Sequence, residues 1–261
     1  MTNFNRYIKI NKDAWNKRTP VHIKSNFYNN KEFKNGKNSL NSIELNAIGN
    51  VKRKNLLHLQ CHFGQDSISF ARMGAKVTAV DFSNIAINEA KKLSLETNIY
   101  VDFIEDNVLK LNLNKQFDII FTSYGVIGWL PDLNKWARTI SNHLKQGGLF
   151  LLTEFHPFLE LIKDNGYNYF YTPEPDIEIS KGTYTDGGSR LVTKTCWWNH
   201  SLTDIFMSLE ANGLKLTLFK EFDYSPFLLE GMVKKETGKY VLEKRAKNST
   251  PYVFVLKAIK K

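Results

Sequence analysis

The sequence predicts an α/β fold in which a mostly parallel sheet carries helices on both faces. From Asn55 onward, apolar runs of strand length alternate with helical segments, which is the pattern of successive βαβ units. A tight loop, CHFGQD, joins the first strand to a helix and contains Gly64, and the next strand ends 17 residues later on Asp81. A glycine turn followed by a carboxylate at this spacing is typical of sheets that hold a nucleoside.

The first 50 residues precede this alternation and carry helical signals instead of strands. A helix that includes the segment 44–48 is expected to end near Gly49, because glycine often terminates helices. We therefore divide the chain into an N-terminal helical cap at 1–50 and a main domain at 51–261. Ligands of open α/β sheets lie at the carboxyl ends of the strands, where such a cap can close over them.

The main domain begins with five strands and three helices. Ser83 is suited to cap the helix after the second strand, and Pro131 with Asp132 begins a later helix. Gly147 and Gly148 then return the chain to an apolar strand. The strands are expected at about 55–60, 75–81, 100–105, 117–123 and 148–155, and the helices at about 65–73, 84–96 and 132–144.

The stretch at about 157–199 interrupts this alternation and is interpreted as an insertion, because it is rich in proline, glycine and aromatic residues. After it, a helix is expected at 201–212, followed by the strands LKLTLFKEF and PYVFVLKAI. A long polar connection at 225–248 separates these two strands. Seven strands are therefore expected in all.

Composition limits the classes of protein to consider. With 261 residues, of which 42% are hydrophobic, the chain can bury a large core. It has no run near the ~20 apolar residues that a membrane helix requires, and its first residues lack a signal-peptide pattern. Cys61 and Cys196 are too isolated in the sequence for a disulfide framework or a metal-binding pair. We expect a cytoplasmic protein without a metal and without a membrane partner.

The formal net charge of +10 raises the question of a nucleic-acid partner. Lysines are spread along the chain, and no basic stripe is interleaved with aromatic residues. A solvated, lysine-rich surface explains this distribution better than a nucleic-acid groove does. Nothing in the sequence indicates an oligomeric state.

The loop after the first strand fits a nucleoside that lacks a phosphate. A nicotinamide dinucleotide requires the spacing G-x-G-x-x-G, whereas here Gln60, His62 and Phe63 surround a single glycine, Gly64. S-adenosylmethionine has no phosphate, and it requires a carboxylate for its ribose and an apolar slot for its adenine. Asp81 is placed to supply the carboxylate.

Further motifs follow Asp81 in the order that such a ligand requires. Phe82 can cover an adenine face, and Asp106, at the end of the third strand, can accept a hydrogen bond from the exocyclic amine. The successive blocks are LLHLQCHFGQD, VTAVDFS, EDNVLKL, FDIIFTSYGVIGWLPD and LKQGGLFLLTEFHP. Through these blocks, residues 55–156 resemble the class I S-adenosylmethionine-dependent methyltransferases. More narrowly, the loop HLQCHFG resembles that of bacterial small-molecule methyltransferase-like proteins.

The resemblance implies a seven-stranded, Rossmann-like sheet whose last strand is antiparallel. It also implies that S-adenosylmethionine is the cofactor and lies across the carboxyl ends of the first and fourth strands. The methionine end would contact the loop, the ribose the second strand, the adenine the second and third, and the sulfonium the fourth. The implied cofactor residues are Gln60, Cys61, His62, Gly64, Asp81, Phe82, Asp106, Asn107, Ser123 and Tyr124.

The loop departs from the D-x-G-x-G-x-G pattern of the broader family at His58, Gln60 and His62. Side chains in place of hydrogens narrow the loop, so the cofactor is expected to bind in a slightly different position or more weakly. His62 is suited either to line the pocket or to brace the loop, and His58 is expected to be a hydrogen-bonded core residue.

Candidate catalytic residues follow the fourth and fifth strands. Methyl transfer from a sulfonium mainly requires alignment and exclusion of water, with a base for some acceptors. Glu154 and His156 are candidate bases, and structural roles in the turn before Pro157 are an equal alternative. Tyr124 is a candidate for a wall against the substrate or the methyl group.

The acceptor is expected to be a small molecule. The motif T-S-Y-G follows the fourth strand, where methyltransferases of nucleic-acid amino groups typically carry Asn-Pro-Pro-Tyr or Asp-Pro-Pro-Tyr. The aromatic-rich insertion favours a closed pocket. Two alternatives stay open: an S-adenosylmethionine-binding protein without turnover, and an RNA methyltransferase that uses the positive charge.

Overall fold

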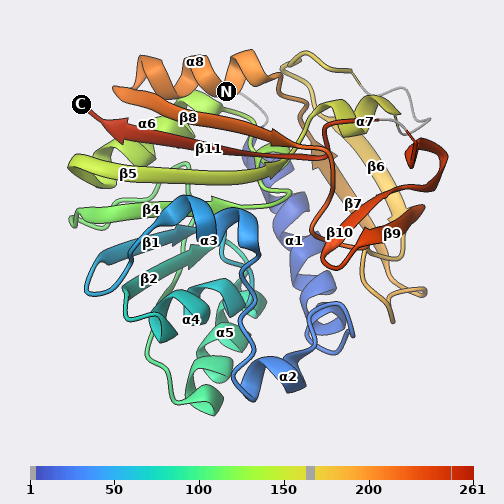
Figure 1. Cartoon of the computed structure of the whole chain (residues 1–261), viewed down its shortest axis with the longest axis horizontal. Coiled ribbons are helices and arrows are strands. Elements are labelled where there is room, and N and C mark those ends of the chain that lie inside the picture. The colour runs from blue at the N-terminus through green and yellow to red at the C-terminus, as the bar shows by residue number, and fades with distance from the viewer. Residues whose placement is uncertain (1–3, 163–167, 248) are drawn as a thin grey trace.

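The computed structural model describes residues 4–162, 168–247 and 249–261, and its centre is a seven-stranded sheet in the order β3-β2-β1-β4-β5-β11-β8 (Figure 1). The first five strands in this order, from β3 through β1 to β5, pair in parallel. Strand β11 is antiparallel to both of its neighbours, β5 and β8. The strands are β1 (Asn55–Leu59), β2 (Lys76–Asp81), β3 (Asp102–Glu105), β4 (Phe117–Ser123), β5 (Leu144–Phe155), β8 (Leu214–Phe222) and β11 (Val253–Lys260).

This sheet confirms the predicted fold class, including the antiparallel last strand. The strand expected at LKLTLFKEF coincides with β8. The largest difference is in β5, which begins at Leu144 instead of near 148 and continues through Gly147 and Gly148. Here Leu144 pairs with Phe117, and the register shifts before Leu149 pairs with Ile119, so the two glycines form an irregular start to the strand instead of a turn before it.

Helices cover both faces of the sheet because the strand side chains alternate between two apolar layers. Leu56 of β1 belongs to the core beneath one set of helices, and Leu57 belongs to the core beneath the other set. The first set is α3 (Ser42–Ile48), α4 (Gln65–Arg72) and α5 (Asn84–Thr97), and the second is α6 (Leu133–His143) and α8 (Leu202–Ala211).

The N-terminal segment is mainly one long helix, α1 (Phe4–His22), which packs against a hairpin formed by β6 (Asp176–Lys181) and β7 (Val192–Trp197) (Figure 1). Asn11 of α1 joins the two elements, because its side chain donates to the carbonyl of Cys196 and accepts from the amide of the same residue, both at 2.8 Å. Helix α1 and the β6–β7 hairpin, although distant in sequence, therefore lie side by side.

Smaller elements complete the chain. The predicted polar connection at 225–248 contains a second hairpin, and residues 163–167 of the predicted insertion lie outside the described residues. The division into a cap, a main domain and an insertion stays a prediction. The remaining elements are α2 (Asn30–Lys34), the 3-10 turns η1 (Ile127–Trp129) and η2 (Glu243–Arg245), α7 (Phe158–Ile162), β9 (Met232–Glu236) and β10 (Lys239–Leu242).

Candidate functional site

The loop between β1 and α4 keeps a glycine-like backbone at positions where the sequence has side chains. Gln60 has φ 56° and His62 has φ 50°, and Gly64 follows with φ 83°. A left-handed conformation costs a residue with a Cβ about 1–2 kcal/mol. The loop therefore retains the path that glycines would give it, at a cost in backbone strain, and the two side chains occupy space beside it.

Gly64 is required by packing on the core side of the loop. A Cβ added at this position would lie 2.5 Å from Cζ of Phe103 in β3 and 3.1 Å from Cβ of Ala90 in α5. Both neighbours are buried in the apolar layer beneath α4 and α5. Because the missing side chain would point into this core, glycine is required here for the start of α4 to pack against the Phe103 ring.

Gln60 and Cys61 have different environments within the loop. The side-chain amide of Gln60 donates to the carbonyl of Val126 at 3.0 Å, whereas its Oε1 is buried without a hydrogen-bond partner among the described residues. Such an acceptor is costly unless a donor reaches it. Cys61 is 5% exposed, and burial raises the pKa of its thiol well above the usual value, so it is a neutral packing group.

Asp81, at the end of β2, closes the base of the loop. Its carboxylate accepts hydrogen bonds from the amide of His62 at 2.9 Å and from the amide of Ser83 at 2.8 Å. Burial raises the pKa of Asp81 to about 6, although these bonds favour the ionised form. Two amides do not saturate a carboxylate, so Asp81 has acceptor capacity for a further ligand.

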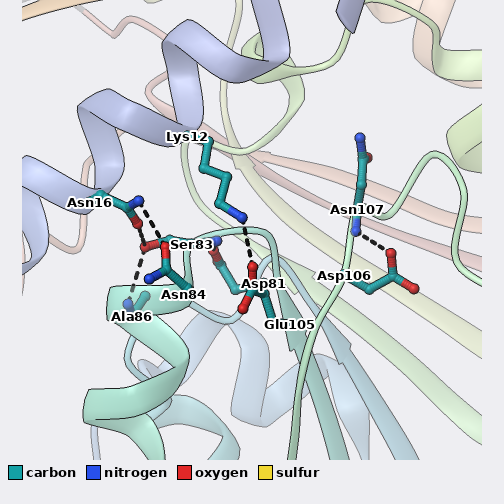
Figure 2. A network of polar contacts seen from close by, with 9 residues as sticks. All are labelled: Lys12, Asn16, Asp81, Ser83, Asn84, Ala86, Glu105, Asp106 and Asn107. Atoms are coloured by element: carbon teal, nitrogen blue, oxygen red, sulfur yellow. Dashed lines mark hydrogen bonds and ion pairs between the residues drawn. The ribbon is translucent and has the colours of Figure 1, made fainter.

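Helix α1 crosses the carboxyl ends of β2 and β3 (Figure 2). Lys12 forms an ion pair with Glu105 at 2.6 Å. Asn16 accepts from the hydroxyl of Ser83 at 2.6 Å and donates to Asn84 at 2.9 Å. These contacts place α1 above Asp81 and help to enclose the region.

The other residues predicted beside the adenine lie at the same edge. Phe82, Asp106 and Asn107 are half-buried. The carboxylate of Asp106 accepts from the amide of Asn107 at 2.7 Å (Figure 2). The structure thus brings together the residues predicted on β2 and after β3.

Asp66, in the first turn of α4, is a further candidate site residue, which the sequence did not indicate. Its carboxylate accepts from Ser39 at 2.6 Å and lies 3.4 Å from the hydroxyl of Ser123, the last residue of β4. Burial raises its pKa, and the two hydroxyls oppose this effect. The available signal in the sequence was an acidic residue in the first turn of the helix after the loop. This signal is not specific, because acidic residues are also common there for their favourable interaction with the helix dipole.

Tyr124 follows Ser123 and forms a pair with Glu44, a second residue that the sequence did not indicate. The phenol donates to the Glu44 carboxylate at 2.9 Å, and Tyr124 has φ 29°. Glu44 is 1% exposed, and burial with the nearby charge of Asp66 raises its pKa to about 7. The pair contains a carboxylate that exchanges its proton near neutrality, directly beside the end of β4.

Glu154 is surrounded by backbone donors. Its carboxylate accepts from the amides of Val126 at 2.8 Å, Ile127 at 3.0 Å and Phe155 at 2.6 Å, and also from the amide of Gly125. Four such bonds leave little capacity for proton transfer from a substrate. This geometry supports the structural alternative, in which Glu154 holds the turn after β4.

His156 is likewise tied into the end of the sheet. Its Nδ1 accepts from the amide of Phe158 at 3.1 Å, and its Nε2 lies 2.9 Å from a carboxylate oxygen of Glu221 on β8. His156 and Glu154, together with Tyr169 and His200, line a cavity of about 70 Å³. This volume is well below the ~300 Å³ of small ligand pockets, so it accommodates a few water molecules.

His62 contacts α1 through a pair of neutral imidazoles. Its Nε2 lies 3.0 Å from Nδ1 of His22, which is 0% exposed. Burial lowers the pKa of His22 to about 3 and that of His62 well below its usual value, so one ring donates to the other without a net charge. The ring of Trp15 lies 5.1 Å from that of His62. This arrangement supports the loop-bracing role for His62.

The described residues contain no group of three His, Cys, Asp or Glu side chains placed to hold a metal ion. His58, as expected, is buried in the core and hydrogen-bonded, with its Nδ1 2.8 Å from the hydroxyl of Ser67. In the part of the chain that the structure describes, no helix has the length and apolar character needed to cross a membrane.

Comparisons with known proteins identify the central segment. Residues 56–148 match the family described as methyltransferase domain. A ubiquinone biosynthesis O-methyltransferase of Proteus mirabilis is 31% identical over 133 residues, which are 50% of this chain and 51% of the relative. A ubiquinone biosynthesis O-methyltransferase of Xanthomonas euvesicatoria is 35% identical over 101 residues, or 38% and 42% of the two chains. The chain thus spans about half the length of the curated relatives it matches.

Solved structures extend the similarity to the whole fold. An S-adenosylmethionine-dependent methyltransferase from Clostridium acetobutylicum superposes with a TM-score of 0.59 at 17% identity, covering 93% of this chain and 95% of the other. The glycopeptide N-methyltransferase MtfA, complexed with S-adenosylmethionine, gives a TM-score of 0.55 at 15% identity, covering 84% and 92%. Residues 56–148 therefore match a methyltransferase domain, and the sheet that contains them has the fold of solved S-adenosylmethionine-dependent methyltransferases.

Proposed function

We propose that this protein is an enzyme that transfers a methyl group from S-adenosylmethionine to a small molecule. The observation that carries the proposal is the charge around the loop. Asp66 and Asp81 flank it, and neither carboxylate forms an ion pair within the described residues. Lys12 lowers the pKa of Asp81 through its charge but is paired with Glu105. Acidic surroundings repel a pyrophosphate and favour a ligand with a sulfonium and an ammonium.

The polar groups of the loop also fit this cofactor. The unpartnered Oε1 of Gln60 is an acceptor that the ammonium of the methionine end can satisfy. The spare acceptor capacity of Asp81 suits a ribose diol, as in other nucleoside sites at the end of a second strand. When bound, S-adenosylmethionine supplies an activated methyl group, and the protein has to align the acceptor and exclude water.

The known proteins that this chain resembles support this chemistry. The curated relatives are O-methyltransferases of ubiquinone biosynthesis, and MtfA was solved with S-adenosylmethionine and with S-adenosylhomocysteine. We infer the same cofactor and a small acceptor for this chain. Both cysteines are free thiols, which supports a reducing compartment such as the cytoplasm.

We assign the cofactor contacts in four groups. The methionine end lies against the loop, the ribose on Asp81, the adenine beside Phe82 and the segment 106–107, and the sulfonium near the end of β4. Gly64 supports the loop from behind, and His62 braces it against α1. The proposed cofactor residues are Gln60, Cys61, His62, Gly64, Asp81, Phe82, Asp106, Asn107, Ser123 and Tyr124.

Among the three catalytic candidates, we place Tyr124 in the reaction. Its hydroxyl contacts Glu44, whose pKa of about 7 suits it to receive a proton near neutral pH. Glu154 and His156 support the turn and the strand end from behind, as their hydrogen bonds indicate. A proton released by the acceptor would pass to the Tyr124–Glu44 pair.

Calorimetric titration tests the cofactor. We expect S-adenosylhomocysteine to bind in the micromolar range and NAD not to bind. Asp81→Asn keeps the volume of the side chain but removes its charge, so it should weaken binding about tenfold or more, the loss expected for about 1.4 kcal/mol. Asp102→Asn, at an exposed position in β3, is the matched control. Binding of NAD without S-adenosylhomocysteine would refute the proposal.

Turnover is tested separately from binding. Incubation with S-adenosylmethionine and mixtures of small phenols, amines and carboxylic acids should produce S-adenosylhomocysteine above the background without acceptor. Intact cofactor binding without product in any mixture would favour a binding protein. Product formed only with bulk RNA, with a strong dependence on salt, would favour the RNA methyltransferase alternative.

A further inference from the structure

Arg18 of α1 carries a buried positive charge for which the described residues supply no counter-ion. Its side chain belongs to a residue that is 9% exposed, and no carboxylate lies within ion-pair distance of it in the described part of the chain. Glu178 influences Arg18 only at a distance, from the exposed side of β6. Buried charges in proteins are normally paired, because the cost of removing a lone ion from water is several kcal/mol.

The hydrogen bonds of Arg18 are also incomplete. One terminal nitrogen, Nη2, donates to the hydroxyl of Thr193 at 3.1 Å and lies 3.5 Å from that of Ser180. Its Nε is buried and has no partner among the described residues. A guanidinium presents five donors in a planar fork that matches a carboxylate. The structure therefore holds this fork in place with most of its donors unused.

The surroundings of Arg18 connect it to the candidate site. The guanidinium carbon lies 5.8 Å from the ring of Trp15 and 5.7 Å from that of Trp129, in the turn after β4. Trp15 in turn contacts His62 of the cofactor loop. Arg18, on α1, thus lies beside the β6–β7 hairpin and the turn after β4. The ring of Trp15 connects it to the cofactor loop.

Charge indicates which anion would suit this position. His22, one turn further along α1, is neutral because its pKa is about 3, and the positive charge of Arg18 contributes to that shift. His62 is neutral for the same main reason, burial. The guanidinium of Arg18 supplies a single positive charge, which balances a carboxylate but leaves a phosphate dianion with one charge unpaired by this residue.

We propose that Arg18 binds a carboxylate of the methyl acceptor, and that the carboxylate is carried on a flat apolar body that packs against Trp15 and Trp129. This inference rests on the proposed function, because it names the chemical class of the acceptor at the same site. Aromatic side chains on two sides of the guanidinium favour such a body through ring stacking.

The test uses the full chain saturated with S-adenosylhomocysteine and three probes of one shape: benzoate, benzamide and phenyl phosphate. Benzoate should bind the wild-type protein at least tenfold more tightly than either of the other two, by calorimetry or ligand-observed NMR. Arg18→Met should weaken benzoate binding at least tenfold and leave the affinity for S-adenosylhomocysteine within about twofold. Arg6→Met, at an exposed position of the same helix, is the control and should change neither.

Stability separates a binding role from a structural one. Without ligand, Arg18→Met should melt at the same or a higher temperature than the wild type, because an unpaired charge has been removed from the interior. A clearly lower melting temperature would assign Arg18 a structural role and overturn the inference. If Arg18→Met does not fold, Arg18→Lys decides: the charge stays but the fork is lost, so benzoate binding should weaken severalfold, and unchanged binding would contradict us.

The outcomes also separate this inference from the proposed function. Failure of the wild-type chain to bind S-adenosylhomocysteine would refute the proposed function. Normal binding of S-adenosylhomocysteine without any benzoate binding would refute only the role of Arg18. A preference for phenyl phosphate would replace the carboxylate by a phosphate monoester, and equal binding of benzamide would show that charge plays no part.

Discussion

Replacement of Gly64 by alanine tests whether this glycine serves the core or the ligand. The new methyl group would lie 2.5 and 2.6 Å from two ring carbons of Phe103 and 3.1 Å from Cβ of Ala90. The left-handed backbone costs an alanine about 1–2 kcal/mol, and overpacking of this kind costs about 1–3 kcal/mol. We therefore expect Gly64→Ala to lower the free energy of unfolding by about 2–5 kcal/mol.

Urea unfolding of two matched variants isolates the packing term. Gly147 also has a left-handed φ, of 71°, but a Cβ there would meet nothing within 4 Å. Gly147→Ala should therefore show only the backbone cost of about 1–2 kcal/mol. In the Gly64→Ala background, Phe103→Leu should recover part of the loss, because it withdraws the ring from the new methyl group. Equal costs for the two glycine variants would refute the assignment of Gly64 to the core.

Two further predictions concern buried carboxylates. Because the pKa of Glu44 is about 7 in the folded chain and 4.5 is its ordinary value, the folded state holds a proton that the unfolded state has released between these values. The free energy of unfolding should fall by about 3 kcal/mol as the pH rises from about 4.5 to above 7. In urea unfolding, Glu44→Gln should lack this dependence on pH. The same dependence in the variant and the wild type would contradict the raised pKa of Glu44. Glu154→Gln places an amide NH₂ among backbone donors, so thermal unfolding should show a free energy of unfolding lower by about 2–4 kcal/mol. Full stability combined with loss of turnover would instead assign Glu154 a catalytic role.

The elements of the main sheet could be predicted because each carries its own local signal. The strand at 214–222 has a glycine before it and a run rich in leucine and phenylalanine, and the glycine loop before α4 is recognisable from the six residues CHFGQD. The β9–β10 hairpin escaped prediction, since its two strands are short and give no regular alternation of apolar and polar side chains. A surface hairpin of this kind is specified by pairing, which a single segment does not reveal.

The candidate site also contains residues that the sequence predicted and residues that it did not. Asp81 and the side chains within the loop were visible in one continuous stretch, whereas the left-handed backbone at Gln60 and His62 is seen only in the structure. Arg18 and Glu44 were not visible, because their significance comes from burial beside residues more than 75 positions away, such as Thr193 and Tyr124. Local patterns identify groups at strand ends, whereas partners contributed by the N-terminal segment depend on tertiary packing.

The place of β11 in the sheet has a consequence for biosynthesis. It follows every other strand in the chain, yet it lies between β5 and β8. Until the ribosome has released this segment, β5 exposes an unpaired edge and β8 has no neighbour in the sheet. The nascent chain therefore passes through a stage in which apolar strands are open to intermolecular pairing, and variants that slow the docking of β11 should aggregate during expression even where the finished protein is stable.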